Sequence, residues 1–216
     1  KWLDDDLVTD IKLNRNGLTF KYDNQNFQTK LKGLFQIENL LQALETIKLV
    51  SIRDSFEINP DKLNYSVENL EIFGRFYEFK NKNSRIFLYD GAHNPQKMKG
   101  LISTLKSLHP DQKFSFLLAF KDGKDYKQML EMVLEVSDKI VVTDFKVSVK
   151  GFGINHSIDS GEINQLVKKL QTRGVDIEYI RDYKKAIESF DKEKLVVTGS
   201  LYFLVQAYKF LNSDIS

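Results

Sequence analysis

The chain has 216 residues, of which 42% are hydrophobic and 29% are charged, a composition typical of one large folded domain or two small ones. Its 32 Lys and Arg residues nearly balance its 30 Asp and Glu residues, so the net charge of +2 gives no electrostatic basis for binding nucleic acid or an anionic membrane. The absence of cysteine excludes disulfides, thiol catalysis and thiolate metal sites. No apolar run approaches the roughly 20 residues that a membrane span needs.

The amino-terminal part of the chain predicts a small antiparallel sheet. Apolar residues recur at near period two over residues 1–33, and Asn16-Gly17 is a strong hairpin signal because both residues tolerate positive φ. The chain starts with Lys1 rather than methionine and has no signal peptide, so we expect a piece of a longer, cytoplasmic protein.

A helix over residues 36–50 should follow this sheet, because its apolar residues form a single stripe at helical spacing. Asn39 lies roughly opposite the stripe, where it is free to meet water or a ligand. Asn59-Pro60-Asp61 predicts a turn and the start of a short helix. We expect a first domain over residues 1–73, a linker over 74–84 and a second domain over 85–216.

The second domain alternates apolar strand-like runs with amphipathic helices. We expect strands at 86–89, 114–119, 140–143, 177–180 and 195–198, and helices at 95–108, 125–136, 158–170, 183–190 and 201–211. This alternation is typical of right-handed βαβ crossovers. The fold class is therefore α/β, with a Rossmann-like, mostly parallel sheet and flanking helices, preceded by a smaller β-hairpin and helix unit.

Ligands of open α/β sheets bind at the carboxyl ends of the strands, so the residues that leave each strand are the candidates for chemistry. That edge should gather Asp90, His93, Asp122, Asp144 and Ser200. The three histidines of the chain are scattered, so we expect no metal cluster. The phosphate-binding pattern G-x-x-x-x-G-K-[ST] is absent from the sequence.

The loop after the first of these strands is the most informative. Asn94 suits a helix cap and Pro95 the first turn of a helix, which explains both on structural grounds. Asp90 has the chemistry to accept two ribose hydroxyls, and His93 to donate to a phosphate or a carboxylate. The simpler explanation is that Asp90 only ends the strand and that His93 is a surface residue. Spacing alone favours this explanation over a binding role.

Other loops allow similar alternatives. Ser200 follows Gly199 at the start of a helix, where the first N–H groups favour a carboxylate or phosphate, but a plain serine cap is the simpler explanation. Asp122-Gly123-Lys124-Asp125 predicts a turn followed by a helix cap. Gly151-Phe152-Gly153 is a lone glycine pair that lacks the full dinucleotide-binding pattern.

Taken together, the motifs resemble those of the folylpolyglutamate synthase/dihydrofolate synthase family, relatives of the Mur ligases. Tyr89-Asp90-Gly91-Ala92-His93-Asn94-Pro95 resembles the family signature almost letter for letter, and Thr198-Gly199-Ser200-Leu201-Tyr202 resembles its carboxyl-terminal strand-to-helix segment. Gly33–Asn39 resembles the family's Gly-x-His-Gln-x-x-Asn, with Phe35 at the histidine position, and Phe73–Phe76 resembles its Gly-Arg segment.

The resemblance implies a role for several residues. Asn39 would contact the adenine of ATP, and Arg75 its phosphate or ribose side. Asp90 would hold the ribose, and His93, the catalytic candidate, would lie near the terminal phosphate or the incoming glutamate. Ser200 would recognise glutamate. Residues 1–73 would be the end of a central ATPase domain, and residues 85–216 the carboxyl-terminal ligase domain.

The resemblance also implies the reaction. ATP would phosphorylate a folate or dihydropteroate carboxylate, and the amine of L-glutamate would attack the resulting acyl phosphate. The phosphate loop and the Mg²⁺ ligands would lie upstream of this chain, so we expect the chain alone to be inactive and monomeric. Two alternatives remain open: a Mur-type amino-acid ligase of cell-wall synthesis, and a non-catalytic module that binds a nucleotide or a protein.

Overall fold

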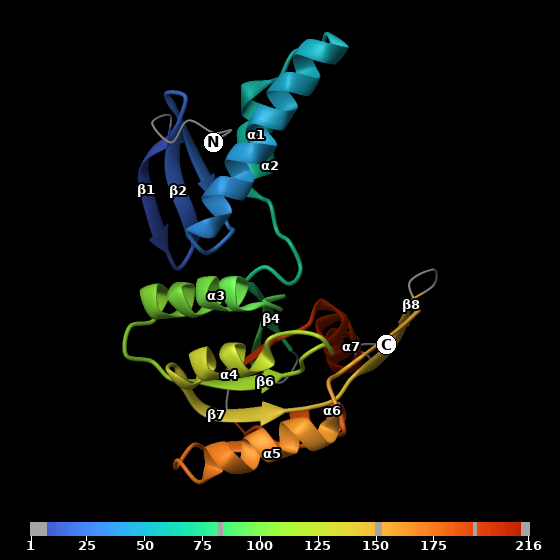
Figure 1. Ribbon diagram of the computed structural model, residues 1–216. Helices are drawn as coiled ribbons and strands as arrows, with labels where there is room; N and C mark the ends of the chain where they lie inside the picture. The colour runs from blue at the N-terminus through green and yellow to red at the C-terminus, as the bar shows by residue number, and fades with distance from the viewer. Residues whose placement is uncertain (1–7, 82–83, 150–152, 192–193, 213–216) are drawn as a thin grey trace. The chain divides into compact units, whose positions relative to one another are not determined.

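The computed structural model describes residues 8–81, 84–149, 153–191 and 194–212. The chain forms two compact units (Figure 1). The first unit contains Lys1–Ile72 with Ser103–Leu108, and the second contains Phe73–Ile102 with His109–Ser216. Among the described helices, none combines the length and the apolar character required to cross a lipid bilayer.

The first unit is an antiparallel sheet covered by two helices. Its strands, in the order β1-β2-β3, are β1 (Val8–Asn14), β2 (Gly17–Tyr22) and β3 (Gln25–Thr29), and its helices are α1 (Phe35–Asp54) and α2 (Pro60–Glu68). The tight turn between β1 and β2 pairs Asn14 with Gly17, as the Asn-Gly signal predicts. The core lies between the sheet and the first half of α1, where Phe20, Leu40 and Leu44 are buried.

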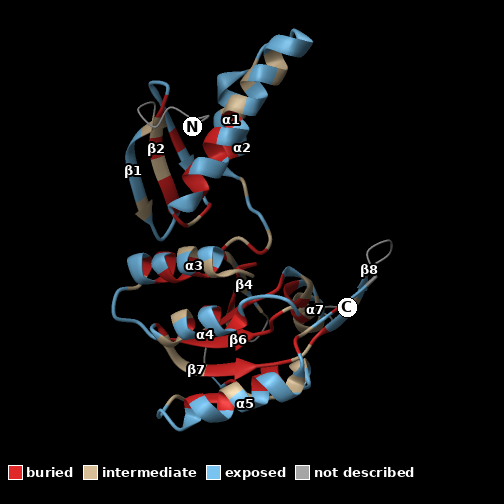
Figure 2. Ribbon diagram, viewed as in Figure 1, coloured by how far each residue is buried: buried red, intermediate tan, exposed pale blue. Residues whose placement is uncertain are grey.

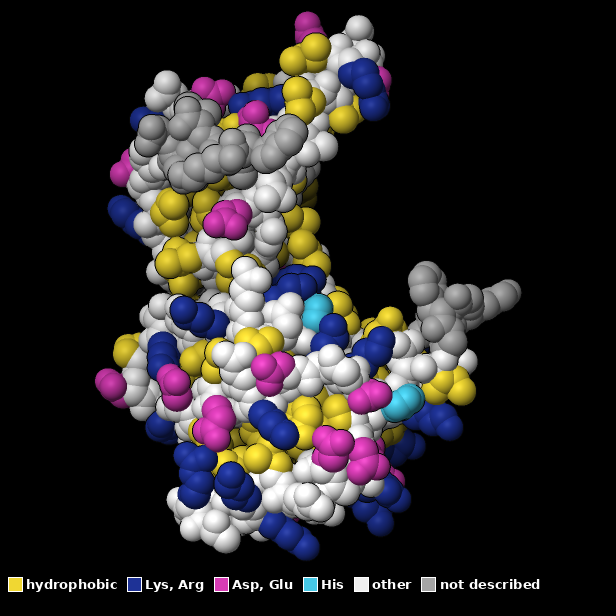
Figure 3. All heavy atoms as spheres, viewed as in Figure 1, with side chains coloured by type: hydrophobic (Ala, Val, Ile, Leu, Met, Phe, Trp, Pro, Cys, Tyr) yellow, Lys and Arg dark blue, Asp and Glu magenta, His cyan; other side chains and the backbone are white. Residues whose placement is uncertain are grey.

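The second half of α1 extends beyond this core. Leu49 and Ile52 are 67% and 76% exposed, and hydrophobic side chains are visible on the surface at this end of α1 (Figure 3). The burial of the apolar residues of α1 therefore ends before the helix does.

The second unit is built on a six-stranded sheet with the order β10-β7-β6-β11-β5-β4. Its strands are β4 (Tyr77–Lys80), β5 (Ile86–Tyr89), β6 (Phe114–Leu118), β7 (Ser137–Val142), β10 (Ile177–Tyr179) and β11 (Lys194–Thr198). All neighbouring strands pair in parallel except β4, which is antiparallel to β5. A separate hairpin consists of β8 (Lys146–Val149) and β9 (Gly153–His156). The predicted α/β class with a mostly parallel sheet is confirmed.

Helices cover both faces of this sheet, so its central strands are buried (Figure 2). The helices are α3 (Pro95–Leu108), α4 (Tyr126–Leu134), α5 (Ser160–Gln171), α6 (Tyr183–Glu188) and α7 (Leu201–Asn212). Right-handed crossovers place α3, α4 and α5 on one face and α6 and α7 on the other. The second face carries an aromatic-rich core in which Phe87, Tyr89 and Phe203 are fully buried.

The structure differs from the sequence predictions in two places. Tyr77–Lys80, predicted as part of a linker over residues 74–84, form the edge strand β4 of the sheet. The predicted loop around Gly151–Gly153 lies within the β8–β9 hairpin. Gly151 and Phe152 are outside the described residues. These strands have only four residues each, which is too short for alternation to separate a strand from a loop.

Candidate active site

The carboxyl ends of β5, β11 and β6 lie side by side because these three strands pair in parallel. Backbone hydrogen bonds continue beyond the strands into the loops. The Asp90 N–H donates to the Val197 carbonyl at 3.1 Å, and the Ala119 N–H donates to the Thr198 carbonyl at 3.2 Å. The loop residues that follow the strands therefore start from fixed positions.

Asp90 is the centre of this arrangement. Its side chain is 5% exposed, and its carboxylate accepts two backbone hydrogen bonds, Oδ2 from the Phe76 N–H and Oδ1 from the Ala92 N–H, both at 2.9 Å. Burial raises the pKa of Asp90 to about 6, although both N–H groups act in the opposite direction. Phe76 has φ of 49°, which is unusual for a non-glycine residue, so Asp90 stabilises a strained backbone.

Gly91 is where the Gly-Arg segment meets the signature loop. The Gly91 N–H donates to the Gly74 carbonyl at 2.8 Å. A Cβ on Gly91 would lie 2.3 Å from Cδ2 of Leu201 and 2.9 Å from Nη1 of Arg75. The Arg75 guanidinium therefore packs directly on the glycine, and it also donates to the Gly74 carbonyl at 3.0 Å. This close approach explains why glycine follows Asp90.

His93 is half-buried, with Nδ1 2.8 Å from the Gly91 carbonyl oxygen. That contact assigns the proton to Nδ1 and leaves Nε2 as an acceptor in the neutral ring. Burial lowers the pKa of His93, and the positive charges of Lys97, Lys124 and Arg75 lower it further, against the opposing effect of the Gly91 carbonyl. These effects all favour the neutral imidazole except the contact with the Gly91 carbonyl.

The loop after β11 completes the site. Gly199 has φ of 101°, and its N–H donates to the Ala92 carbonyl at 3.1 Å. A Cβ on Gly199 would lie 2.6 Å from the Ala119 carbonyl oxygen, so only glycine fits between the two loops. Ser200, which follows it, is 2% exposed and starts the turn into α7, where its carbonyl accepts from the Leu204 N–H at 3.0 Å.

The structure thus brings together Arg75, Asp90, His93 and Ser200, four of the five predicted site residues. Asn39 belongs to the first unit, where it is exposed in the first turns of α1 and donates through Nδ2 to Oε1 of Gln36 at 2.8 Å.

The other acidic residues predicted at this edge lie further along it. Asp122 and Asp144 line a separate hollow of about 410 Å³, together with His156. Asp144 is engaged by the Tyr179 hydroxyl, which donates to its Oδ2 at 2.8 Å, and by Arg181 at 3.5 Å. Within the described part of the chain, no group of three His, Cys, Asp or Glu side chains is arranged to hold a metal ion.

Two cations near His93 are absent from the sequence-based site. Lys97 lies in the first turn of α3, and Lys124 lies in the turn before α4. Their positive charges act on His93, and the sequence offered no specific signal for either residue. Both predicted helix caps are confirmed: Asn94 Oδ1 accepts from the Lys97 N–H at 2.9 Å, and Asp125 Oδ1 accepts from the Gln128 N–H at 3.2 Å.

Comparison with solved structures identifies the class of fold. The chain is similar to the folylpolyglutamate synthase of Thermotoga maritima, with a TM-score of 0.73 and 24% identity over 96% of this chain and 46% of that chain. It is also similar to the Mycobacterium tuberculosis folylpolyglutamate synthase complexed with ADP and AMPPCP, with a TM-score of 0.73 and 17% identity over 96% of this chain and 48% of that chain. The fold is shared with these ligases.

Sequence comparison identifies the family. A family model described as dihydrofolate synthetase, C-terminal domain, matches residues 72–210, and the chain therefore belongs to this family. The dihydrofolate synthetase of Saccharomyces cerevisiae is 24% identical over 228 aligned positions, which cover 96% of this chain and 52% of the yeast protein. The chain thus spans about half the length of the curated relatives that it matches.

Proposed function

We propose that this chain is the carboxyl-terminal part of an ATP-dependent ligase that joins L-glutamate to a folate or dihydropteroate carboxylate. The observation that supports the proposal is the set of hydrogen bonds around Asp90 and Gly91, which joins the segment that carries Arg75 to the loop that carries His93. An arginine and a histidine on adjoining loops suit a reaction in which phosphates and carboxylates meet an amine.

Each predicted site residue has a proposed role. Arg75 binds the phosphate or ribose side of ATP, and Asn39 binds its adenine. Asp90 accepts the ribose hydroxyls through the carboxylate lone pairs that its two backbone hydrogen bonds leave free. Ser200 binds glutamate. Residues 1–73 form the end of a central ATPase domain, and the residues from 85 onward form the ligase domain.

The proposed chemistry has two steps. The terminal phosphoryl group of ATP is transferred to an oxygen of the folate-linked carboxylate, which produces ADP and an acyl phosphate. The glutamate nitrogen then attacks the carbonyl carbon, the bond from that carbon to the phosphate oxygen breaks, and the amine loses a proton. We assign His93 as the acceptor of that proton at Nε2; the hydrogen bond between Nδ1 and the Gly91 carbonyl supports this assignment, since it leaves Nε2 free to accept.

Mg²⁺ would supply charge neutralisation for the phosphoryl transfer. We assign the metal ligands and the phosphate loop to the other half of the ligase, since this chain spans about half the length of its curated relatives. On this proposal the chain alone has no ligase activity, and the complete ligase is a monomer.

The test compares two proteins, this chain and a chain extended upstream to the length of the yeast relative. The extended chain should form ADP only when dihydropteroate or a folate and L-glutamate are both present. Asp90→Asn should weaken ATP binding far more than glutamate binding, whereas Ser200→Ala should raise KM for glutamate selectively. Asp182→Asn, which changes a helix cap elsewhere in the second unit, is the matched control.

Two outcomes would overturn the proposal. ADP formation with a cell-wall precursor and an amino acid, but not with a folate, would establish a Mur-type ligase. Tight Mg-ATP binding by this chain alone, without turnover in the extended chain, would establish a non-catalytic nucleotide-binding module. The family match favours the folate reaction over both.

A further inference from the structure

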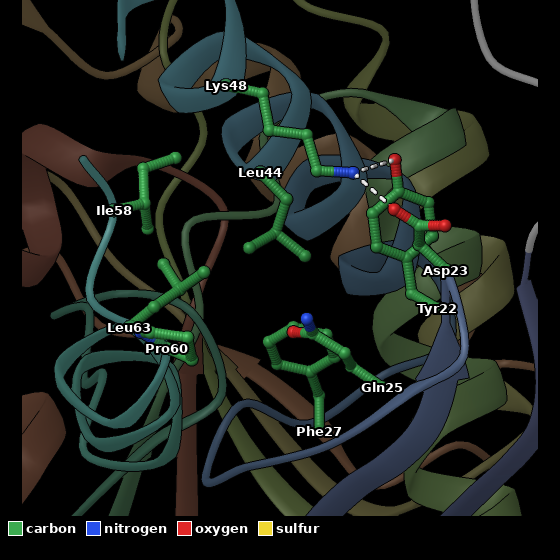
Figure 4. Close-up of a pocket in the computed structure, with 9 residues that line it drawn as sticks. All are labelled: Tyr22, Asp23, Gln25, Phe27, Leu44, Lys48, Ile58, Pro60 and Leu63. Atoms are coloured by element: carbon green, nitrogen blue, oxygen red, sulfur yellow. Dashed lines mark hydrogen bonds and ion pairs between the residues drawn. The ribbon is translucent and has the colours of Figure 1, made fainter. Parts of the chain in front are cut away.

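A pocket of about 140 Å³ lies within the first unit, between the sheet, α1 and the start of α2 (Figure 4). Its apolar floor is formed by the Phe27 ring from β3, Leu44 from α1 and Leu63 from α2. Ile58 and Pro60 close the side that leads into α2. Three different elements thus surround a space that the side chains of this unit do not fill.

The volume limits what this pocket holds. An apolar cavity of roughly 150 Å³ in another protein binds benzene, and sites for drug-sized ligands start near about 300 Å³. At about 140 Å³, this pocket has room for one six-membered ring and is too small for a fused bicyclic ring system.

The rim of the pocket is held by a network of charged and aromatic groups. Lys48 Nζ lies 3.1 Å from Asp23 Oδ2, 3.1 Å from Glu45 Oε1 and 3.4 Å from the Tyr22 hydroxyl. The same ammonium lies 4.5 Å from the centre of the Tyr22 ring, and the Tyr22 hydroxyl donates to Glu45. Lys48 is therefore already paired and does not act as a free cation for an anionic ligand.

The network contains one more negative than positive charge. Lys48 pairs with two carboxylates, Asp23 on the pocket lining and Glu45 outside it, and the Asp23 side chain is 61% exposed. Figure 4 shows the Asp23 carboxylate beside Lys48 and the Gln25 amide beside the Phe27 ring. Because Glu45 also neutralises Lys48, the exposed Asp23 carboxylate keeps negative charge that a cationic ligand in the pocket can pair with.

We propose that this pocket binds a single aromatic ring that carries a cationic amino group. The ring packs on Phe27, Leu44 and Leu63, and the ammonium group pairs with Asp23. None of these residues belongs to the proposed ligase site, so the proposal stands or fails separately from the proposed function.

The test is an NMR titration of this chain with three one-ring probes: benzylamine, toluene and phenylacetate. Benzylamine should cause saturable shifts at the methyl groups of Leu44 and Leu63 and should bind about tenfold more tightly than phenylacetate, since the two probes share the ring and carry substituents of opposite charge. Shifts that do not saturate, or equal affinities for benzylamine and phenylacetate, would overturn the proposal.

Two variants separate the charge from the cavity. Asp23→Asn, at an exposed position, should weaken benzylamine about three- to tenfold and leave toluene unchanged, whereas the control Asp54→Asn, an exposed carboxylate paired with Arg53, should change neither. Leu63→Phe should fill the pocket and abolish the binding of both. Undiminished benzylamine binding in Asp23→Asn or in a folded Leu63→Phe would refute the assignment.

A fourth probe identifies the source of such a ligand. The peptide Phe-Gly-Gly presents an aromatic ring and an ammonium group at the amino end of a chain. Binding of this peptide as tight as that of benzylamine supports the same site with a peptide as its ligand, and binding of benzylamine alone supports it with a free amine.

Discussion

The hydroxyl of Tyr89 has an unusual environment for a polar group. Tyr89 is 0% exposed in the aromatic-rich core of the second unit, and its hydroxyl has no hydrogen-bond partner among the residues that the structure describes. Phe73 and Tyr208 lie against the ring, with centroid separations of 5.5 and 5.7 Å. Burial raises the pKa of Tyr89, so the phenol stays neutral over the whole working pH range. We predict that Tyr89→Phe stabilises the protein.

The magnitude follows from two opposing terms. A buried polar group without a partner costs about 1–3 kcal/mol, which the variant removes. Loss of one oxygen leaves a void of roughly 15 Å³, which costs about 0.4 kcal/mol at about 24 cal/mol per Å³. The net gain in the free energy of unfolding is about 0.6–2.6 kcal/mol, and the melting temperature of a chain of this size rises by about 2–4 °C for each kcal/mol.

Amide hydrogen exchange is the suitable assay, because it reports on each unit separately. The amides of Leu88 in β5 and Val196 in β11 belong to the second unit and should exchange about tenfold more slowly in Tyr89→Phe. Tyr208→Phe, at a half-buried position against the same ring, is the control and should change stability by less than about 0.5 kcal/mol. A loss of about 1 kcal/mol in Tyr89→Phe would show that the hydroxyl has a partner and would refute the reasoning.

Three further predictions concern the two units. The folded pKa of Asp90, about 6, lies above its unfolded value. The contribution of the Asp90 carboxyl to stability is therefore fully present below about pH 4 and is lost as the pH rises through about 6. A carbon-13 titration of the carboxyl with a midpoint below about 4 would contradict this prediction. Gly199→Ala should cost at least about 3 kcal/mol in urea unfolding, since its Cβ would meet the Ala119 carbonyl; unchanged stability would mean that the two loops separate easily. The hydrogen bond from Tyr22 lowers the pKa of Glu45, so Glu45→Gln should destabilise the first unit by well under about 1 kcal/mol at pH 7. This difference in stability should vanish as the pH falls through the folded pKa of Glu45. A difference that persists in acid would argue against the charge as its cause.

Much of the second unit could be predicted from its sequence because its signals are local. Long apolar runs such as Phe114–Leu118 and the caps Asn94 and Asp125 each determine an element without help from distant residues. The position of β11 between β5 and β6 could not be predicted, since strand order depends on packing between distant segments. The edge strand β4 was missed because its four residues carry too little alternation.

The candidate site, too, was predictable where its signals are local and not where they depend on the folded backbone. The motifs around Asp90, His93 and Ser200 predicted that their loops share one edge of the sheet, and parallel pairing of the strands brings those loops together. The sequence did not indicate that the carboxylate of Asp90 is bound by the Phe76 and Ala92 N–H groups, because side-chain direction depends on the folded backbone. The assignment of ribose binding to Asp90 stays a prediction.

The central position of β11 also affects the order in which this protein acquires its structure. Among the described strands, β11 comes last in the chain, yet it lies between β5 and β6, which come much earlier. Until it inserts, both neighbours present unpaired strand edges that are open to association with other chains. The candidate active site therefore needs a strand that comes late in the chain, and a truncation before Lys194 removes the middle of the sheet rather than its edge.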